Sequence, residues 1–125
     1  MSVSDSQAQL QSLLGSFNGQ HGIMGSMLIA KSGEVYGSSL PPNIDIGTIG
    51  ALSGTLFANN DVSIQKMNRG QLHQMTLLTD QVILHFYQIK DFLLMVITSK
   101  GQRINLEGLI KLVEERAQQI SPLLP

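Results

Sequence analysis

Apolar residues near the start of the chain recur with the spacing of an α-helix. Leu10 and Leu14 would share one side of a helix over residues 5–16, and Ser4 or Asp5 stands where an N-cap belongs. Glycines follow this segment at positions 19 and 22. The pattern therefore predicts a short amphipathic helix that ends before the first strand.

Two strand-like segments come next, at residues 23–30 and 35–40. The connection between them, residues 31–34, is a turn sequence because Gly33 can adopt a positive φ at little cost. The sequence predicts a β-hairpin here. Pro41 and the proline after it end the second strand.

Three further apolar segments lie at residues 72–78, 82–89 and 92–98. The connections between them are so short that neighbouring segments must run antiparallel. The last segment does not alternate between apolar and polar residues, which is typical of a strand covered on both faces. The sequence thus predicts an antiparallel meander that ends in a central strand.

A second amphipathic helical pattern closes the chain, at residues 105–120. Lys100 and Gly101 lead into it, and Pro122 ends it. The order of elements is then helix, two strands, helix, three strands, helix. This order predicts an α+β sandwich built around one antiparallel sheet.

The segment between the hairpin and the meander carries the most information. Asp45 is placed to cap a helix that runs to about Ala58, and Asn59 begins a polar tripeptide expected to end it. No charged residue occurs from Ile46 to Asn60. A helix that is apolar nearly all round is predicted to be buried.

This middle helix has one side of small residues and one of large residues. Gly47, Gly50 and Gly54 share the small side, and Leu52 and Leu56 lie opposite. Each glycine inside a helix costs about 1 kcal/mol relative to alanine, which close approach of another backbone would offset. Two interpretations are open. In the first, the small side serves only to let the helix lie tightly on the chain's own sheet. In the second, one side of the helix packs on the sheet and the other side packs on a second protein chain. The second interpretation is favoured because one sheet offers no further layer, and self-association is its simplest form.

Composition supports a protein partner and disfavours several other classes. The 125 residues suit a single domain over 1–125, with an ordered core from about residue 5 to 121. Charged residues make up 14%, against about 25% in typical soluble domains, and the net charge of -1 offers no basic surface for nucleic acid. Without cysteine, disulfides and thiolate chemistry are excluded, which suits a cytoplasmic protein. We expect no membrane insertion, because no secretory signal or spanning apolar run occurs.

Candidate chemistry is sparse. If Thr79 and Asp80 form a two-residue turn, His85 lies opposite Gln74, and His73 points to the other side of the sheet. The two histidines then cannot share a metal ion. Neither glycine-rich phosphate-binding pattern occurs, and the spacing suggests no Ser, His and acid set. We expect no metal, no cofactor and no enzyme activity.

These features together resemble the Roadblock/dynein light-chain family. The likeness covers most of the chain. It rests on the hydrophobic strand with its turn at 31–34, on Asn43-Ile44-Asp45 before the small-residue helix, on the three-strand meander, and on the closing helix after Gly101. The resemblance implies a profilin-like sandwich, a five-stranded antiparallel sheet with the N- and C-terminal helices on one face and the middle helix on the other.

The resemblance also implies a function. Members of the family are non-catalytic scaffolds that dimerise through the middle helix and the following strand, and in several relatives the helix pair binds small Ras-like GTPases. Lys66 and Arg69 are candidates for contact with an acidic partner surface. Carried onto this sequence, the homodimer surface comprises Gly47, Gly50, Ser53, Gly54, Phe57, Leu72, Gln74 and Thr76.

Two other functions stay open at this stage. One is a small-ligand sensor, in which the sheet and the middle helix enclose an apolar pocket lined by Met27, Met75 and Phe86. The other is a light-chain subunit of a larger complex that has no GTPase partner. A sizeable pocket inside one protomer would favour the sensor.

Overall fold

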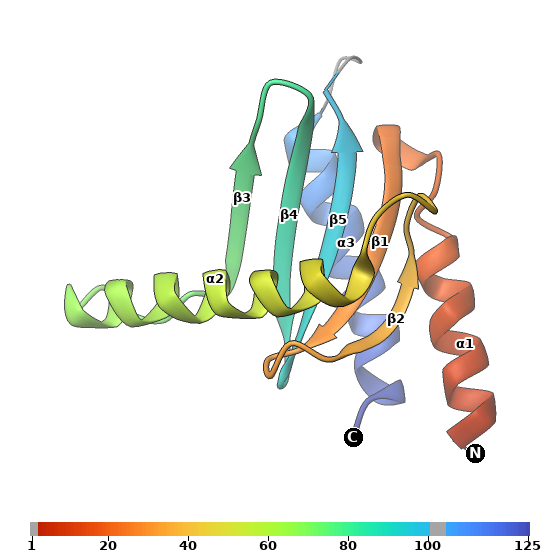
Figure 1. The fold of residues 1–125 in the computed structure, drawn as a ribbon, viewed down its shortest axis with the longest axis horizontal. Coiled ribbons are helices and arrows are strands. Elements are labelled where there is room, and N and C mark those ends of the chain that lie inside the picture. Colours follow the sequence, from red (N-terminus) through yellow and green to blue (C-terminus); the bar gives the residue numbers. More distant parts are fainter. Residues whose placement is uncertain (1–2, 101–104) are drawn as a thin grey trace.

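One five-stranded antiparallel sheet organises the structure (Figure 1). The computed structural model describes residues 3–100 and 105–125, so Gly101 lies outside the described residues. The strands are arranged in the order β2-β1-β5-β4-β3, which leaves β2 and β3 at the edges. The elements in chain order are α1 (Val3–Gly15), β1 (Ile23–Ala30), β2 (Val35–Ser39), α2 (Ile46–Lys66), β3 (Gln74–Leu78), β4 (Val82–Ile89), β5 (Phe92–Ser99) and α3 (Leu106–Ile120), with one-turn 3-10 helices at Gln20–Gly22 and Ser121–Leu123.

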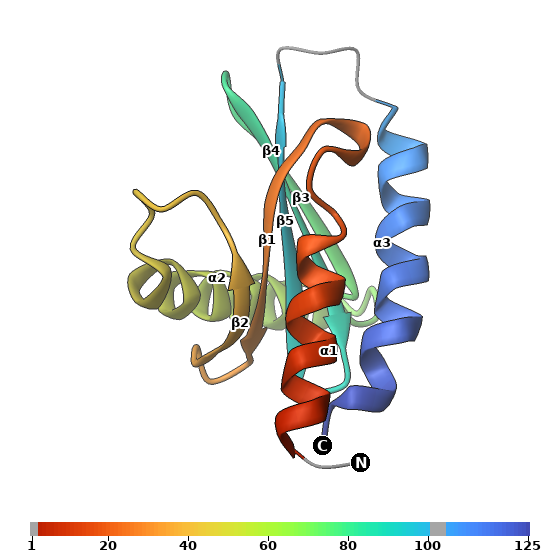
Figure 2. The same cartoon turned by 90° about the vertical axis from the view of Figure 1, so that its right-hand side faces the viewer.

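Helices cover both faces of this sheet, as Figure 2 shows. Helices α1 and α3 lie on one face, where Leu14, Leu94 and Val113 belong to one buried apolar cluster. Helix α2 crosses the other face, where Phe57 packs with Met95 in a second cluster. The profilin-like sandwich expected from the sequence is therefore confirmed.

The centre of the sheet follows the hydrophobic pattern closely. Every residue of β5 from Phe92 to Thr98 is buried, as expected for a non-alternating strand. The β1–β2 hairpin turns at Gly33, whose φ of 101° is in the region that glycine tolerates best. The Gly33 amide donates to the carbonyl of Ala30 at 2.8 Å, which closes the turn.

The sequence predicts the start of α3 more accurately than the start of α1. The side chain of Asn105 caps α3 by accepting from the amide of Gly108, at the expected position. Helix α1 starts at Val3, so that Ser4 and Asp5 lie inside its first turn, and the expectation that one of them is the N-cap was wrong.

The β3–β4 hairpin turns one residue later than expected. The amide of Thr79 donates to the carbonyl of Val82 at 3.0 Å, so the two turn residues are Asp80 and Gln81. The Thr79 hydroxyl also accepts from the Gln81 amide at 3.1 Å, which stabilises this turn. His85 consequently lies opposite Thr76 rather than Gln74. Because the register moves by two residues, each side chain keeps its predicted face of the sheet.

Helix α2 is longer than the sequence suggested, since it continues past Ala58 and ends at Lys66. Polar side chains satisfy their own hydrogen bonds along the helix instead of ending it. The Asn60 amide donates to the carbonyl of Leu56 at 2.9 Å, and the Ser63 hydroxyl donates to that of Asn59 at 3.1 Å. The extra turns carry α2 beyond the β3 edge of the sheet (Figure 1).

Two glycines let α2 lie directly on the β1–β2 turn. A Cβ at Gly50 would stand 2.9 Å from the carbonyl oxygen of Gly33 and 2.9 Å from Cγ2 of Val35. A Cβ at Gly54 would stand 3.1 Å from the carbonyl oxygen of Lys31. These distances are shorter than ordinary van der Waals contact, so the helix can reach this position only with glycine at position 50.

We predict that Gly50→Ala destabilises the protein although alanine favours helix formation. Forcing a methyl group against the Gly33 carbonyl should outweigh the gain of about 1 kcal/mol in helix propensity and lower the free energy of unfolding by about 1 to 2 kcal/mol. Gly47→Ala is the matched control, because the nearest atom to its Cβ is Oδ1 of Asp45 at 3.7 Å. Urea denaturation at one protein concentration measures both, and equal effects would contradict the close-packing account.

Candidate protein interface

The outward side of α2 is apolar or uncharged and faces solvent in the single chain. Leu52 is 62% exposed and Leu56 is 38% exposed. Thr48, Thr55 and Asn59 share this side, and the first charged residue beyond them on the helix is Asp61. The expectation of a helix buried all round therefore does not hold within one chain, because the sheet covers only one side of it. Two exposed leucines on an uncharged stretch of helix are typical of a surface that another protein covers.

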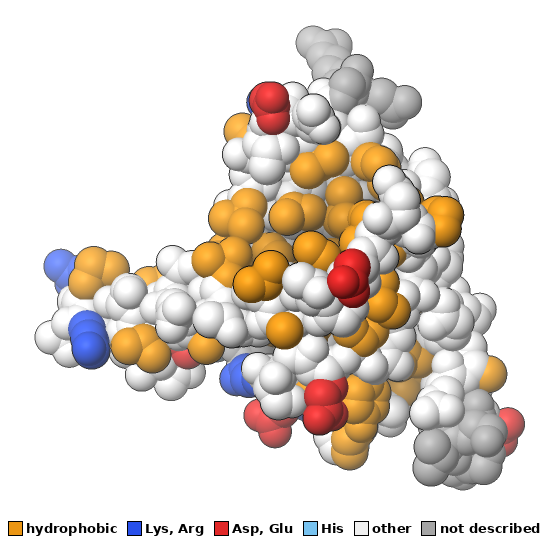
Figure 3. Space-filling view, viewed as in Figure 1, with side chains coloured by type: hydrophobic (Ala, Val, Ile, Leu, Met, Phe, Trp, Pro, Cys, Tyr) orange, Lys and Arg blue, Asp and Glu red, His pale blue; other side chains and the backbone are white. Residues whose placement is uncertain are grey.

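An open apolar groove lies beside this side of α2, where the helix leaves part of the sheet uncovered. Figure 3 shows apolar side chains gathered over the strands next to the helix. The groove has a volume of about 270 Å³. We call it the α2–β3 groove; it is lined by Ile44, Ile49, Leu52, Ser53, Leu56, Leu77, Leu84, Phe86, Met95 and Ile97.

The free edge of β3 adjoins the groove. In an antiparallel pair, residues alternate between those bonded to the neighbouring strand and those whose backbone groups face away from it. The Gln88 amide donates to the carbonyl of His73, so His73 faces β4, and the alternation turns the backbone of Gln74, Thr76 and Leu78 toward the open edge. An edge of this kind can pair with a strand of another chain.

The residues expected at a dimer surface separate into two groups. Gly50, Ser53, Gly54 and Phe57 are buried, and the two glycines contact the chain's own β1–β2 turn. The small side of α2 thus packs on its own sheet, and the large side is the one left open. The other members of the set lie at or near the open surface: Gly47 and Thr76 are exposed, and Leu72 and Gln74 are half-buried.

The two cationic residues that are candidates for contact with a partner lie at the end of α2 that extends beyond the sheet. Lys66 is the last residue of the helix, Arg69 follows it, and both are exposed. Figure 3 shows Lys and Arg side chains at this end of α2. The Asp61 carboxylate accepts from the Leu72 amide at 2.8 Å, and this hydrogen bond is the main reason that the pKa of Asp61 is lowered. The bond ties the helix to the segment that leads into β3.

His85 is a buried polar group beneath this edge, with 1% of its surface exposed. Its Nδ1 lies 2.7 Å from the Thr76 hydroxyl and its Nε2 lies 3.0 Å from Oε1 of Gln74. Burial lowers the pKa of His85, and the negative charge of Glu114 on α3 partly opposes this effect. The ring is therefore held neutral, hydrogen-bonded at both nitrogens to side chains of the edge strand.

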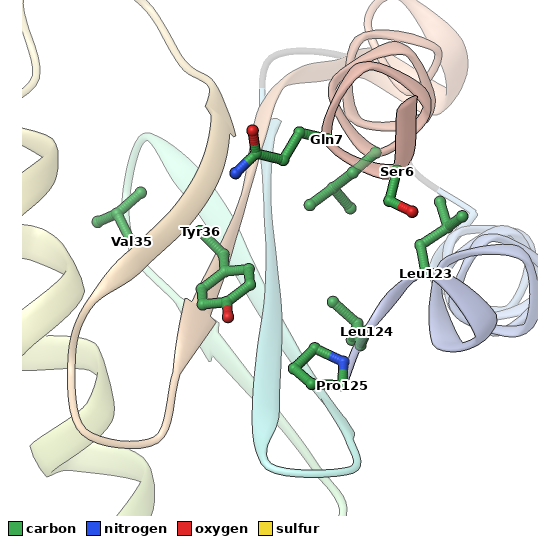
Figure 4. Close-up of a pocket in the computed structure, with 8 residues that line it drawn as sticks. Ser6, Gln7, Val35, Tyr36, Leu123, Leu124 and Pro125 are labelled. Carbon is green, nitrogen blue, oxygen red and sulfur yellow. The ribbon is translucent and has the colours of Figure 1, made fainter. Parts of the chain in front are cut away.

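A second hollow, of about 690 Å³, lies on the other face of the sheet. In Figure 4, Tyr36 of β2 and Gln7 of α1 border it together with the last residues of the chain. This hollow is not the pocket in which a small-ligand sensor of the kind considered above would bind its ligand. That pocket would lie between the sheet and α2, where Met27 and Phe86 are buried in the apolar cluster.

The part of the chain that the structure describes contains no group of three or more His, Asp or Glu side chains able to hold a metal ion. His73 and His85 point to opposite faces of the sheet, as expected. Among the described helices, none is both long and apolar enough to cross a membrane. The chemistry at the surface described above is that of association, through apolar contact and backbone pairing.

Sequence reasoning assigned the open side of α2 incompletely. Leu52 and Leu56 were recognised as part of the large side of the helix, but the expected interface set did not include them. The sequence signal that could have identified these leucines as the open side is that they lie on an uncharged stripe of the helix, opposite the glycines. His85 was recognised only as a strand residue, and its hydrogen bonds to the edge strand could not be read from spacing.

Relatives in sequence are similar over most of the chain, although no model of a known protein family matches it. The uncharacterized protein MJ1340 of Methanocaldococcus jannaschii is 28% identical over 102 residues, which cover 82% of this chain and 87% of that protein. The uncharacterized protein MJ0310 of the same organism is 29% identical over 100 residues, which cover 80% and 85%.

Solved structures share the fold at low sequence identity. The Roadblock/LC7 domain from Streptomyces avermitilis has a TM-score of 0.80 at 13% identity and covers 90% of this chain and 94% of that one. MglB of Myxococcus xanthus has a TM-score of 0.84 at 13% identity, with coverage of 92% and 94%. Profilin Ib of Acanthamoeba castellanii has a TM-score of 0.58 at 15% identity, with coverage of 90% and 97%.

The fold is thus of the Roadblock/LC7 type, as the sequence resemblance implied. Within that type, the chain adopts an MglB-like arrangement of sheet and helices.

We predict that the stability of the protein falls as the pH is lowered below about 6.5. Because burial lowers the pKa of His85 in the folded state, the unfolded chain binds more protons in this range, and stability rises with pH there. Urea denaturation between pH 7.5 and 5.5 measures the slope. His85→Gln, which cannot titrate, should reduce it, and an unchanged slope in this variant would contradict the assignment to His85.

Proposed function

We propose that this chain is a single Roadblock-type domain that acts as a non-catalytic, homodimeric scaffold and binds or regulates a small Ras-like GTPase in the cytoplasm. The observation that carries the proposal is the uncharged, exposed side of α2 beside an open apolar groove and a free strand edge. Together these features offer both apolar contact and backbone pairing to a second chain.

The shape of the chain supports self-association in particular. Helix α2 projects past β3, while the α2–β3 groove lies open on the same face of the sheet (Figures 1 and 3). In a two-fold arrangement, the projecting helix of each copy would lie over the groove of the other, and the two β3 edges would come together. The resemblance to the Roadblock family implies dimerisation through the same two elements, the middle helix and the following strand.

The interface in this proposal differs in part from the one expected from the sequence. Leu52 and Leu56 replace the four buried residues as the main apolar contacts of α2. Gln74 and Thr76 keep their expected place, because their backbone groups face the open edge of β3. Gly47 and Leu72 stay in the set at its periphery.

The GTPase partner is a separate part of the proposal. It comes from the sequence resemblance, which implies that a pair of middle helices forms the platform, and from the MglB-like fold. Lys66 and Arg69, exposed at the projecting end of α2, would then meet acidic residues of the partner.

We predict that Leu52→Glu converts the dimer to a monomer. Leu52 is 62% exposed, so glutamate costs the folded monomer little, whereas burying its charge between two copies costs several kcal/mol. Leu106→Glu is the matched control: Leu106 is a 42% exposed leucine in the first turn of α3, on the opposite face of the sheet. Size-exclusion chromatography with light scattering measures the mass. A wild-type protein that is monomeric at tens of micromolar would refute the dimer.

We predict that the dimer binds a small Ras-like GTPase with an affinity that depends on the bound nucleotide. The test uses purified GTPases of the source organism, loaded with GDP or with a non-hydrolysable GTP analogue, and isothermal titration calorimetry. The double variant Lys66→Glu, Arg69→Glu should weaken binding at least tenfold without changing the mass of the dimer. If no GTPase binds in either nucleotide state, a light-chain role without a GTPase partner takes its place.

A further inference from the structure

The sheet has a second edge, at β2, and the ladder shows which backbone groups of that strand face outward. The Ala30 amide donates to the carbonyl of Glu34 at 2.8 Å, so Ala30 faces β2. Two residues earlier on β1, Leu28 faces β2 as well, and its partner Gly37 is therefore bonded to β1. Ser38 comes next on β2 and directs its amide and carbonyl away from β1, toward the edge.

The outward carbonyl of Ser38 is already bonded within the chain, by helix α1. Nε2 of Gln11 donates to it at 2.6 Å. Gln11 can reach the strand because α1 runs beside β2 (Figures 1 and 2) and packs on it closely: a Cβ at Gly37 would stand 3.0 Å from a side-chain carbon of the helix. Just beyond α1, Nδ2 of Asn18 donates to the Ser39 hydroxyl at 2.9 Å. These contacts occupy the end of β2 where a further strand would have to bond.

The other end of β2 is interrupted by a β-bulge. Leu28 pairs with Gly37, but the next residue of β1, Ile29, pairs with Val35, so Tyr36 is the extra residue. A bulge breaks the alternation of the strand and increases its twist, and both effects oppose pairing with another strand. The five residues of β2 are thus divided between a bulge and a carbonyl that Gln11 occupies.

The β3 edge differs from the β2 edge in both respects. Its pairing with β4 is regular over all five residues of the strand. The side chains of Gln74 and Thr76 bond to His85 within the sheet, not to a helix that lies across the edge. Of the two edges, β3 is therefore the one that offers a regular strand to a second chain.

This difference decides how far edge pairing can continue. Two copies joined at β3 would form one continuous sheet with a β2 strand at each end. If those ends could also pair, every dimer would offer two further contacts, and the assembly would grow into an open fibre. A closed β2 edge limits the assembly to two copies.

We propose that Gln11 closes the β2 edge, so that association of this chain through its sheet stops at two copies. The inference rests on the proposed homodimer and adds the feature that limits its size. Gln11 is suited to a test because its side chain is exposed, so that its amide can be removed without disturbing the apolar core.

The test is sedimentation equilibrium of the full chain from tens to hundreds of micromolar. The wild type should have the mass of two chains throughout. Gln11→Ala removes the side-chain amide and keeps a strong helix former, and its weight-average mass should at least double over the same range. Gln9→Ala is the matched control, because it makes the same change at another exposed position of α1, and it should stay at two chains.

A second variant shows whether growth uses β2. Ser38→Pro removes an outward-facing amide without removing a bond to β1, so adding it to Gln11→Ala should return the mass to two chains. A Gln11→Ala protein that stays at two chains overturns the inference alone, as does a double variant that grows like the single one. A wild type that grows beyond two chains also contradicts it. A wild type that is monomeric throughout overturns the proposed homodimer, and this inference with it.

Discussion

The position of α2 depends on its contact with the β1–β2 turn. With glycine at positions 50 and 54, the helix backbone rests on the carbonyls of Gly33 and Lys31, closer than any side chain would allow. The helix is thereby fixed across the sheet at a height and angle that leave its other side open. The exposed leucines, the groove beside them and the projecting end of α2 all follow from this single close approach.

Periodicity and turn chemistry were enough to predict an α+β sandwich around one antiparallel sheet, whereas the assignment of each helix to a face of the sheet came from the resemblance to the Roadblock family. The non-alternating run of β5, the turn at Gly33 and the start of α3 at Asn105 each depend on residues close together in the chain, and each was placed correctly or within a residue. The end of α2 was not placed correctly. Asn60 and Ser63 are polar residues of a kind that usually marks a helix end, but here their side chains donate hydrogen bonds to carbonyls of their own helix.

The candidate site was harder to predict, because its arrangement is decided by contacts between distant segments. Spacing shows that α2 has a small and a large side but not which side faces the sheet. The carbonyls of the β1–β2 turn decide that, and they carry no periodic signal. Likewise, the hydrogen bonds of His85 depend on a register that the Thr79 hydroxyl shifts by two residues.

The open edge of β3 has a consequence for partner choice. Backbone amides and carbonyls are alike in every chain, so edge pairing by itself would accept a paralogue of this fold as readily as an identical copy. Discrimination must come from side chains, and two of those at the edge on the α3 side, Gln74 and Thr76, are engaged with His85. In the proposed dimer, the choice between an identical copy and a paralogue would then depend on α2, through how the shapes of residues such as Leu52 and Leu56 fit the opposing groove.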